Sequence, residues 1–355
     1  MKKNLTNVLK ALGFMAIGMT ILFLLYQSQN KAFQAQCVTD GISKENCSLI
    51  KKLLDDFRQT NPFWIILIVI TTLLSHLARA LRWNQLIESL GEKPRIINGL
   101  FSVIIGFFAN LGIPRIGEIV RATTMAKYEN IPTEKLFGTV VVDRIVDMIT
   151  FIILVGVTFF LEFDTISTKL GELMATNQSK NTAAPSNLWY LLVGLCIIGV
   201  ALIIFYIKRP ENLMVKKVKG LVTGVLEGIA TISKLERPWL FLFYTVAVWF
   251  LYYIMLYLCI PAFGPTRHLG MQAALIVFVF GAFGFLVPSP GGMGTYHWLI
   301  IQALTLFGIQ AADGFSFANI AYFTGQIISN VGFGLLALIL LPIVNKNYHP
   351  NTNKS

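Results

Sequence analysis

Charge is scarce in this sequence. Only 13% of its 355 residues are Asp, Glu, Lys or Arg, whereas 55% are hydrophobic. A soluble domain carries roughly 25% charged residues, so the composition excludes an ordinary soluble protein. Several apolar runs reach about 20 residues, the length that crosses a hydrocarbon core of roughly 30 Å. The sequence therefore predicts an all-α polytopic membrane protein, because these runs lack the alternating polarity of membrane β-strands.

Histidine and cysteine are also scarce, with four of each. The histidines show no metal-ligand spacing, and the sequence has no GxSxG, HExxH or Walker motif. We therefore expect no enzymatic activity, no metal and no cofactor. Cys37 and Cys47 share one polar stretch, too far apart for CxxC redox chemistry. They can form a disulfide if that stretch faces an oxidising compartment.

The net charge of +11 would suggest nucleic-acid binding in a soluble protein. No aromatic–basic RNA motif, zinc finger or heptad repeat accompanies it. Membrane proteins concentrate Lys and Arg in their cytoplasmic loops, and this rule explains the positive charge more simply. We therefore expect no nucleic-acid partner.

The apolar runs predict about eight transmembrane helices in a single domain, residues 1–355. They lie near residues 12–26, 62–81, 136–161, 188–207, 238–260, 269–287, 297–310 and 317–343. Re-entrant or broken segments are predicted near residues 96–122 and 288–297. The run 96–113 is predicted to be re-entrant, because a full crossing would place the basic stretch 208–237 outside, against the positive-inside rule.

This topology places both termini on the cytoplasmic side of a bacterial cytoplasmic (inner) membrane. The polar stretch 27–61 is then extracytoplasmic, and residues 46–59 within it predict a short amphipathic helix. The basic stretch 208–237 is predicted to be an amphipathic segment at the cytoplasmic surface.

The stretch NLGIPRIGEIVRA, residues 110–122, follows an apolar run and predicts a broken helix. Gly112 permits the break, and Pro114 suits the first turn of a new helix because it has no N–H and a fixed φ. Free N–H groups at a helix start favour an anion. The charged residues of this stretch lie at intervals of three: Arg115, Glu118 and Arg121.

A second charged stretch, VVDRIVDM at residues 141–148, lies inside a predicted span. A charge near the bilayer centre costs at least ~2.5 kcal/mol, so such residues need partners. We expect a cluster in which arginines bind a phosphate-bearing headgroup and carboxylates orient them. The predicted phosphate ligands are Arg79, Arg82, Arg115, Arg121 and Arg144; the orienting groups are Glu118, Asp143 and Asp147.

A second break, PSPGGMG, lies at residues 288–294. Two interrupted segments, one in each half of the chain, are typical of transporter sites. The predicted backbone donors are Pro290, Gly291, Gly292 and Gly294, in a concavity suited to anions. His297 follows as a candidate proton carrier. The plainer interpretations stay open: a solvated ion pair, a structural clamp between helices, a tight turn and a packing histidine.

Four motifs in order resemble the transmembrane flippase domain of bacterial lysylphosphatidylglycerol synthases and its stand-alone relatives: RALRW (79–83), N…GIPRIGEIVRA (110–122), DRIVD (143–147) and PSPGGMG (288–294). The resemblance covers roughly residues 10–343. It implies a helical domain with re-entrant segments and a cavity for lipid headgroups. Aminoacyl transfer is not expected, since that activity belongs to a synthase domain.

The resemblance also implies site residues. Arg115, Glu118 and Arg121 lie in PRIGEIVR (114–121), which matches the family pattern PRxGExxR. Arg144 and Asp147 match the family pattern ERxxD, although Asp143 stands where glutamate is usual. Many relatives also carry a glutamate where this chain has His297, so an imidazole would replace that carboxylate.

These observations favour an integral membrane transporter of the flippase type. Its partner would be an anionic phospholipid, an aminoacylated lipid or a polyprenyl phosphate. One alternative is a non-transporting membrane partner of a glycosyltransferase or lipid-modifying enzyme. Another is an intramembrane lipid-transfer enzyme using His297 and Asp147. The sequence leaves the oligomeric state open.

Overall fold

The computed structural model describes residues 2–39, 47–165, 167–168, 171, 235–287 and 289–350. The regular structure in these ranges is helical throughout, which confirms the all-α class. The chain forms two compact units, residues 1–150 with 235–355 and residues 151–234. The predicted span 188–207 and all but the end of the basic stretch 208–237 lie outside the described residues.

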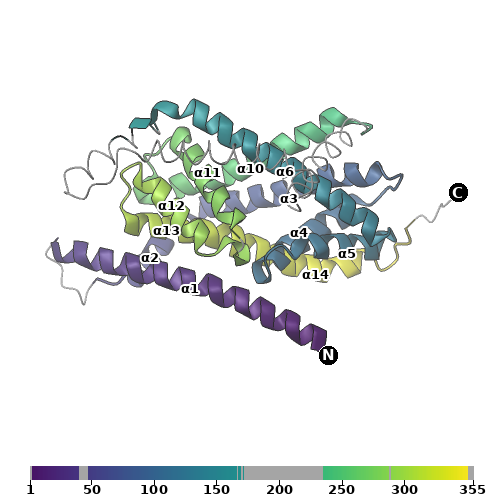
Figure 1. Ribbon diagram of the computed structural model, residues 1–355, viewed down its shortest axis with the longest axis horizontal. Coiled ribbons are helices and arrows are strands. Elements are labelled where there is room, and N and C mark those ends of the chain that lie inside the picture. Colours follow the sequence, from purple (N-terminus) through teal and green to yellow (C-terminus); the bar gives the residue numbers. More distant parts are fainter. Residues whose placement is uncertain are drawn as a thin grey trace, which may run out of the picture. The chain divides into compact units, whose positions relative to one another are not determined.

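Three described helical segments are long and apolar enough to cross a membrane: α3 (Pro62–Glu88), α10 (Pro238–Ala262) and a continuous segment over Ala311–Val344. α3 and α10 both begin with proline, which suits the first turn of a helix. Asn61 caps α3 by accepting a 2.9 Å hydrogen bond from the Phe63 N–H. α10 packs along α3 (Figure 1).

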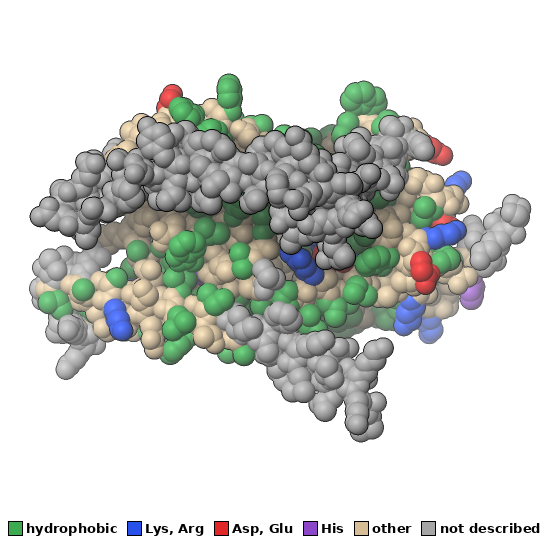
Figure 2. All heavy atoms as spheres, in the orientation of Figure 1, with side chains coloured by type: hydrophobic (Ala, Val, Ile, Leu, Met, Phe, Trp, Pro, Cys, Tyr) green, Lys and Arg blue, Asp and Glu red, His purple; other side chains and the backbone are tan. Residues whose placement is uncertain are grey.

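The continuous segment consists of α13 (Ala311–Tyr322), the π-helix η4 (Phe323–Val331) and α14 (Gly332–Val344). Large apolar side chains stay exposed on these helices and on α3, as a lipid-facing surface requires. They include Ile66, Ile70, Leu335, Leu336 and Ile339. On the face in Figure 2, charged side chains gather near the C-terminus, whereas green hydrophobic side chains spread across the middle.

The first predicted break is a helical hairpin of α4 (Ile96–Gly112) and α5 (Gly117–Glu129). The second helix was expected to start near Pro114, which is wrong, because it starts at Gly117. Arg115 adopts a left-handed conformation with φ 64°, so Pro114 and Arg115 belong to a turn. The Asn110 amide oxygen closes this turn by accepting a 2.7 Å hydrogen bond from the Gly117 N–H.

The second break is also a hairpin, formed by α11 (Met271–Leu286), a 3-10 turn η3 (Pro290–Gly292) and α12 (Thr295–Thr305). The 11 residues of α12 extend for only ~16 Å, short of the ~30 Å hydrocarbon core. The segments 269–287 and 297–310, expected as two spans, therefore pair as short helices.

Glycine shapes the second hairpin. Gly291, Gly292 and Gly294 have φ of 55°, 76° and 84°, a region that favours glycine. The turns of the two hairpins lie close together, because a Cβ on Gly291 would come 2.8 Å from Leu111 Cδ2 at the end of α4.

The N-terminal helix α1 (Lys2–Thr39) continues through residues predicted to be a polar loop. The predicted amphipathic helix is α2 (Leu49–Gln59). Lys52 of α2 bridges Asp56 and Asp313 at 2.7 Å each, which ties α2 to α13. Partial burial alone would lower the pKa of Lys52, but hydrogen bonds to Asp313 and Asp56 raise it above its ordinary value.

The structure joins Cys37 of α1 to Cys47, two residues before α2, in a disulfide. Trypsin cleaves after Lys31, Lys44 and Lys51, so it separates the two cysteines. We expect residues 32–44 and 45–51 of protein purified without reductant to migrate as one linked peptide, separated by reduction. Mass spectrometry checks this.

Removing the bond with a Cys37→Ser, Cys47→Ser double substitution should lower the unfolding free energy by about 2–4 kcal/mol. Alkylation of denatured protein without reductant tests the bond itself. Buried Cys259 is free in the structure, so it should react and serves as the control. Alkylation of Cys37 and Cys47 without reductant would contradict the bond.

The base of the first hairpin is tied to the end of α14. Glu129 accepts a 2.6 Å hydrogen bond from the Asn98 amide and a 2.8 Å hydrogen bond from the Tyr348 hydroxyl. Asn98 and Asn345 also exchange amide hydrogen bonds. Burial and the bond to Glu129 raise the pKa of Tyr348 to about 12, so this tie stays intact at physiological pH.

Candidate functional site

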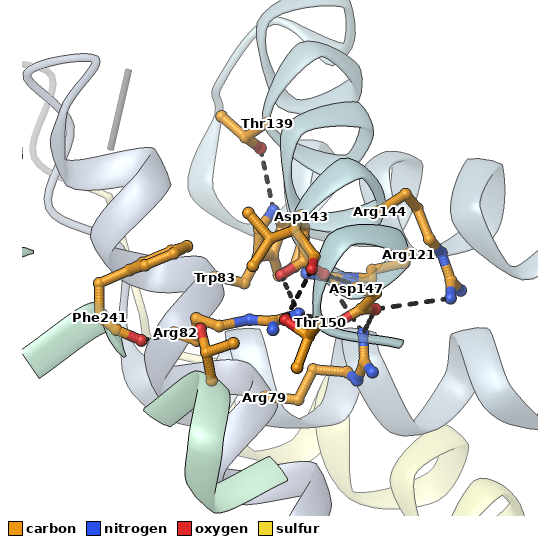
Figure 3. A network of polar contacts seen from close by, with 12 residues as sticks. Arg79, Arg82, Trp83, Arg121, Thr139, Asp143, Arg144, Asp147, Thr150 and Phe241 are labelled. Atoms are coloured by element: carbon orange, nitrogen blue, oxygen red, sulfur yellow. Dashed lines mark hydrogen bonds and ion pairs between the residues drawn. The ribbon is translucent and has the colours of Figure 1, made fainter. Parts of the chain in front are cut away.

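Five of the predicted charged residues meet between three helices of one compact unit (Figure 3). Helical spacing explains why each helix presents them together: residues three or four apart share one face. α3 supplies Arg79 and Arg82, α5 supplies Arg121, and α6 (Thr133–Leu161) supplies Asp143 and Asp147.

Asp143 lies at the centre of this arginine cluster, which we define as Arg79, Arg82, Arg121, Asp143 and Asp147. Its side chain is fully buried and contacts all three arginines. One carboxylate oxygen lies 2.6 Å from Arg82 Nη2. The other lies 2.8 Å from Arg121 Nη1 and 3.4 Å from Arg79 Nη1. Asp143 therefore holds α3, α5 and α6 together.

Asp147 adds a second bridge between α6 and α3. Its two oxygens lie 2.7 Å from Arg79 Nη1 and 2.7 Å from Arg82 Nη2. Three guanidinium groups against two carboxylates leave the arginine cluster with a net charge of +1. Desolvating each ion costs several kcal/mol, which only close and multiple pairing can offset. Arg79, Arg82, Asp143 and Asp147 each have at least two such partners. Arg121 pairs with Asp143 alone, and its Nε and Nη2 have no hydrogen-bond partner among the described residues.

Aromatic rings complete the surroundings of the arginines. A guanidinium over a ring face gains from cation–π attraction, most of all when desolvated. The Trp83 ring is held in place, since its indole N–H donates a 2.9 Å hydrogen bond to the Thr139 hydroxyl. The pairs are Arg121 over Trp83 at 3.9 Å, Arg82 over Phe241 at 6.0 Å and Arg79 over Phe107 at 5.5 Å.

These rings were missed by sequence reasoning. The signal for Trp83 was present in RALRW, where it lies four residues after Arg79. Phe107 and Phe241 lie in distant apolar runs rich in aromatic residues. Nothing in their local sequence distinguishes them from lipid-facing neighbours.

Glu118 and Arg144 form the accessible edge of the site. The Glu118 carboxylate pairs with Arg144 Nη2 at 2.5 Å. Arg144 Nη1 lies 3.8 Å from Asp147, which connects this pair to the arginine cluster. The Arg144 side chain is 40% exposed, against 0–5% for the three arginines of the cluster. Among the arginines that take part in these ion pairs, Arg144 is therefore the one that an incoming ligand can reach most easily.

Arg115 does not join the cluster, which corrects the prediction. It is exposed and makes no ion pair within the described part of the chain. Its left-handed turn carries it away from the helical register that brings Glu118 and Arg121 inward. The anion site expected from free N–H groups at this helix start also loses a donor, because Asn110 already occupies the Gly117 N–H.

The second break contacts the first hairpin but contributes no ion pair to the arginine cluster among the described residues. The turn with Pro290, Gly291, Gly292 and Gly294 touches α4. His297 is 1% exposed and packs with the rings of Tyr296 and Tyr322, at 5.7 and 4.8 Å between centroids. Its Nδ1 atom has no hydrogen-bond partner among the described residues. His297 therefore packs in an aromatic group that is separate from the arginine cluster.

Metal-ligating residues do not gather in the described ranges. No group of three or more His, Cys, Asp or Glu side chains there is placed to hold a metal ion. The chemistry of the site is that of ion pairs and hydrogen bonds, and it suits an oxyanion.

Comparisons with known proteins agree with this architecture. A UPF0104 membrane protein of Methanocaldococcus jannaschii is 33% identical over 106 residues, which cover 29% of this chain and 32% of that protein. The chain thus matches about a third of that relative's length, and no solved structure matches it. The family model for the lysylphosphatidylglycerol synthase TM region matches residues 48–332, which contain the whole arginine cluster. The chain therefore belongs to the lysylphosphatidylglycerol synthase transmembrane family and is a multi-pass membrane protein.

Proposed function

We propose that this protein moves an anionic, phosphate-bearing lipid between the leaflets of a membrane. The observation that carries the proposal is a buried cluster of net charge +1, bordered by the half-exposed Arg144. Charged groups inside a membrane protein are costly and usually mark a substrate path. An excess of guanidinium groups favours phosphate, which arginine binds in a bidentate manner.

Arg144 would take the headgroup directly. In the empty site Glu118 neutralises Arg144, which avoids an unpaired charge at the edge of the hydrocarbon. An arriving phosphate would replace Glu118 as the partner of Arg144. The carboxylates of Asp143 and Asp147 would meanwhile hold the three buried arginines fixed, and their net positive charge would attract the headgroup.

The lipid tails would stay in hydrocarbon while the headgroup moves along the site. An anionic phospholipid, an aminoacylated lipid and a polyprenyl phosphate all present the phosphate that this mechanism requires. Since the chain has no nucleotide-binding motif, movement would follow a lipid or ion gradient. Both termini would lie on the inner side of a bacterial cytoplasmic membrane, and the positive-inside rule supports that orientation.

Arg144→Gln is the variant that tests this function. We expect it to slow the movement of fluorescent phosphatidylglycerol in proteoliposomes by about 10-fold or more, the cost of one charge-assisted hydrogen bond. Phosphatidylcholine serves as the zwitterionic comparison. Arg58→Gln is the matched control, because Arg58 is 79% exposed in a surface pair. Equal rates for folded Arg144→Gln and wild type would contradict the proposal.

A structural clamp is the competing role, and one observation favours it: every arginine of the cluster is already paired. The protein would then be a non-transporting partner that docks a glycosyltransferase or lipid-modifying enzyme. In that case folded wild-type protein moves no lipid of a broad panel, and the Arg144→Gln substitution lowers protein yield alone.

A further inference from the structure

A buried histidine lies next to the arginine cluster on α3. His76 is 2% exposed, and its Nε2 lies 2.9 Å from the Asn330 amide oxygen on the π-helix η4. The Asn330 amide nitrogen donates a 2.8 Å hydrogen bond to Gln326, so its oxygen faces the imidazole. With the amides in this orientation, Nε2 carries the proton in the neutral ring. Nδ1 is left as a buried acceptor without a partner among the described residues.

An unpaired buried acceptor is rare, and leaving one costs free energy. Asn330 lies on the π-helix η4, and π-helical turns occur frequently at functional sites. η4 also buries Thr324 and Ser329 completely. The Thr324 hydroxyl oxygen likewise has no partner within the described ranges. The site is therefore polar and incompletely satisfied at membrane depth.

His76 is linked to the arginine cluster through α3 and Phe107. His76 and Arg79 are i, i+3 neighbours on one helix face. The Phe107 ring contacts both, at 4.7 Å from the imidazole centroid and 5.5 Å from the guanidinium carbon. Arg79 is the charged group that faces His76. α4, α10, η4 and α14 contain no charged residue, and Tyr252 of α10 is the titratable group nearby, hydrogen-bonded to Arg79.

We propose that His76 is a proton-binding site coupled to anion binding at the arginine cluster, so that a proton and an anionic headgroup enter together. A proton on Nδ1 places a second cation beside Arg79, in a region whose net charge is already positive. An anion at the site offsets that charge. By linkage, the bound anion raises the proton affinity of His76, and the proton raises the affinity for the anion by the same factor. This inference rests on the proposed function.

The test uses full-length protein in detergent with dihexanoyl phosphatidylglycerol as the probe, whose phosphodiester charge does not change over the pH range. We expect the affinity near pH 5 to exceed that near pH 8 by about 5-fold or more. Binding in a weakly buffered solution should also take up protons, detected with a pH indicator. Glycerophosphoglycerol separates free phosphodiester from lipid, and dihexanoyl phosphatidylcholine tests the need for net charge.

His76→Gln should bind the probe with the same affinity at both pH values and without proton uptake. His76→Asn is a second variant in case glutamine disturbs folding. His268→Gln is the matched control, because His268 is exposed, and His297→Gln tests the other buried histidine. Both should keep the wild-type pH dependence.

Each outcome decides a different claim. Wild-type binding without pH dependence or proton uptake overturns the coupling and leaves the proposed function standing. Unchanged pH dependence in both His76 variants overturns the assignment to His76, and its loss in His297→Gln alone moves the proton to that residue. Absence of binding and of lipid movement at every pH overturns the proposed function and this inference together.

Discussion

Replacing Asp143 with alanine is expected to prevent the protein from accumulating in folded form. Asp143 is fully buried and pairs with Arg79, Arg82 and Arg121. Its loss leaves three buried guanidinium groups with only the carboxylate of Asp147. Breaking a buried pair costs about 3–5 kcal/mol, a large share of the roughly 5–15 kcal/mol that stabilises a domain. Size-exclusion chromatography of a fluorescent fusion, followed by thermal unfolding in detergent, measures the effect.

Two further variants separate charge from shape. Asp143→Glu keeps the carboxylate, so it should retain much more folded protein than Asp143→Ala. Asp55→Ala removes a carboxylate that is 45% exposed in a surface pair and should cost no more than about 1 kcal/mol. If Asp143→Ala folded as well as Asp55→Ala, the ion pairs would not hold α3, α5 and α6 together.

The central part of the site could be predicted from sequence because helix periodicity is reliable. The spacings 79/82 and 143/147 place each pair on one face whatever the tertiary structure. A charge within an apolar run must then find a partner. Together these rules brought Arg79, Arg82, Asp143 and Asp147 to one site before the structure placed them there.

Arg115 shows where such reasoning fails. Arg115 is three residues before Glu118, as Glu118 is three residues before Arg121. This equal spacing predicted that all three side chains would join one cluster. The difference comes from a turn, since the left-handed backbone of Arg115 and the Asn110–Gly117 hydrogen bond interrupt the helical register. Turn conformation depends on tertiary contacts, which the spacing of charged residues along the sequence does not report. The five predicted arginines and three predicted carboxylates sum to a net charge of +2, and without Arg115 the sum is +1.

The break at the second hairpin was predicted from PSPGGMG, but the pairing of the two flanking segments as short helices was missed for a different reason. Apolar runs at 269–287 and 297–310 satisfy a hydropathy criterion, but α12 ends at Thr305 and a turn with Gly308 at φ 77° follows. Hydropathy reports that a segment avoids water and says nothing about whether it crosses. The short helix is protected by packing on α11, where the Thr295 hydroxyl donates a 2.8 Å hydrogen bond to the Gly284 carbonyl.

The second substitution with a large expected effect is at Gly117, where α4 and α5 approach each other closely. A Cβ on Gly117 would collide with the Gly106 carbonyl oxygen and lie 2.6 Å from the Asn110 amide nitrogen. Backbone cannot yield as a flexible side chain does, so α5 would have to move away from α4. That movement would draw Arg121 away from Asp143 and Glu118 away from Arg144, because all of these pairs depend on the position of α5.

Gly117→Ala should therefore destabilise the protein by at least about 1–3 kcal/mol, the usual cost of overpacking, and reduce lipid movement in the protein that folds. Helix propensity alone predicts the opposite sign, since alanine is favoured over glycine by about 1 kcal/mol within a helix. Gly112→Ala is the matched control, because a Cβ there meets nothing within 4 Å. Thermal unfolding of both variants decides between propensity and packing. If Gly117→Ala were as stable as Gly112→Ala, the glycine contact would not set the distance between α4 and α5, and the position of Arg121 and Glu118 would need another cause.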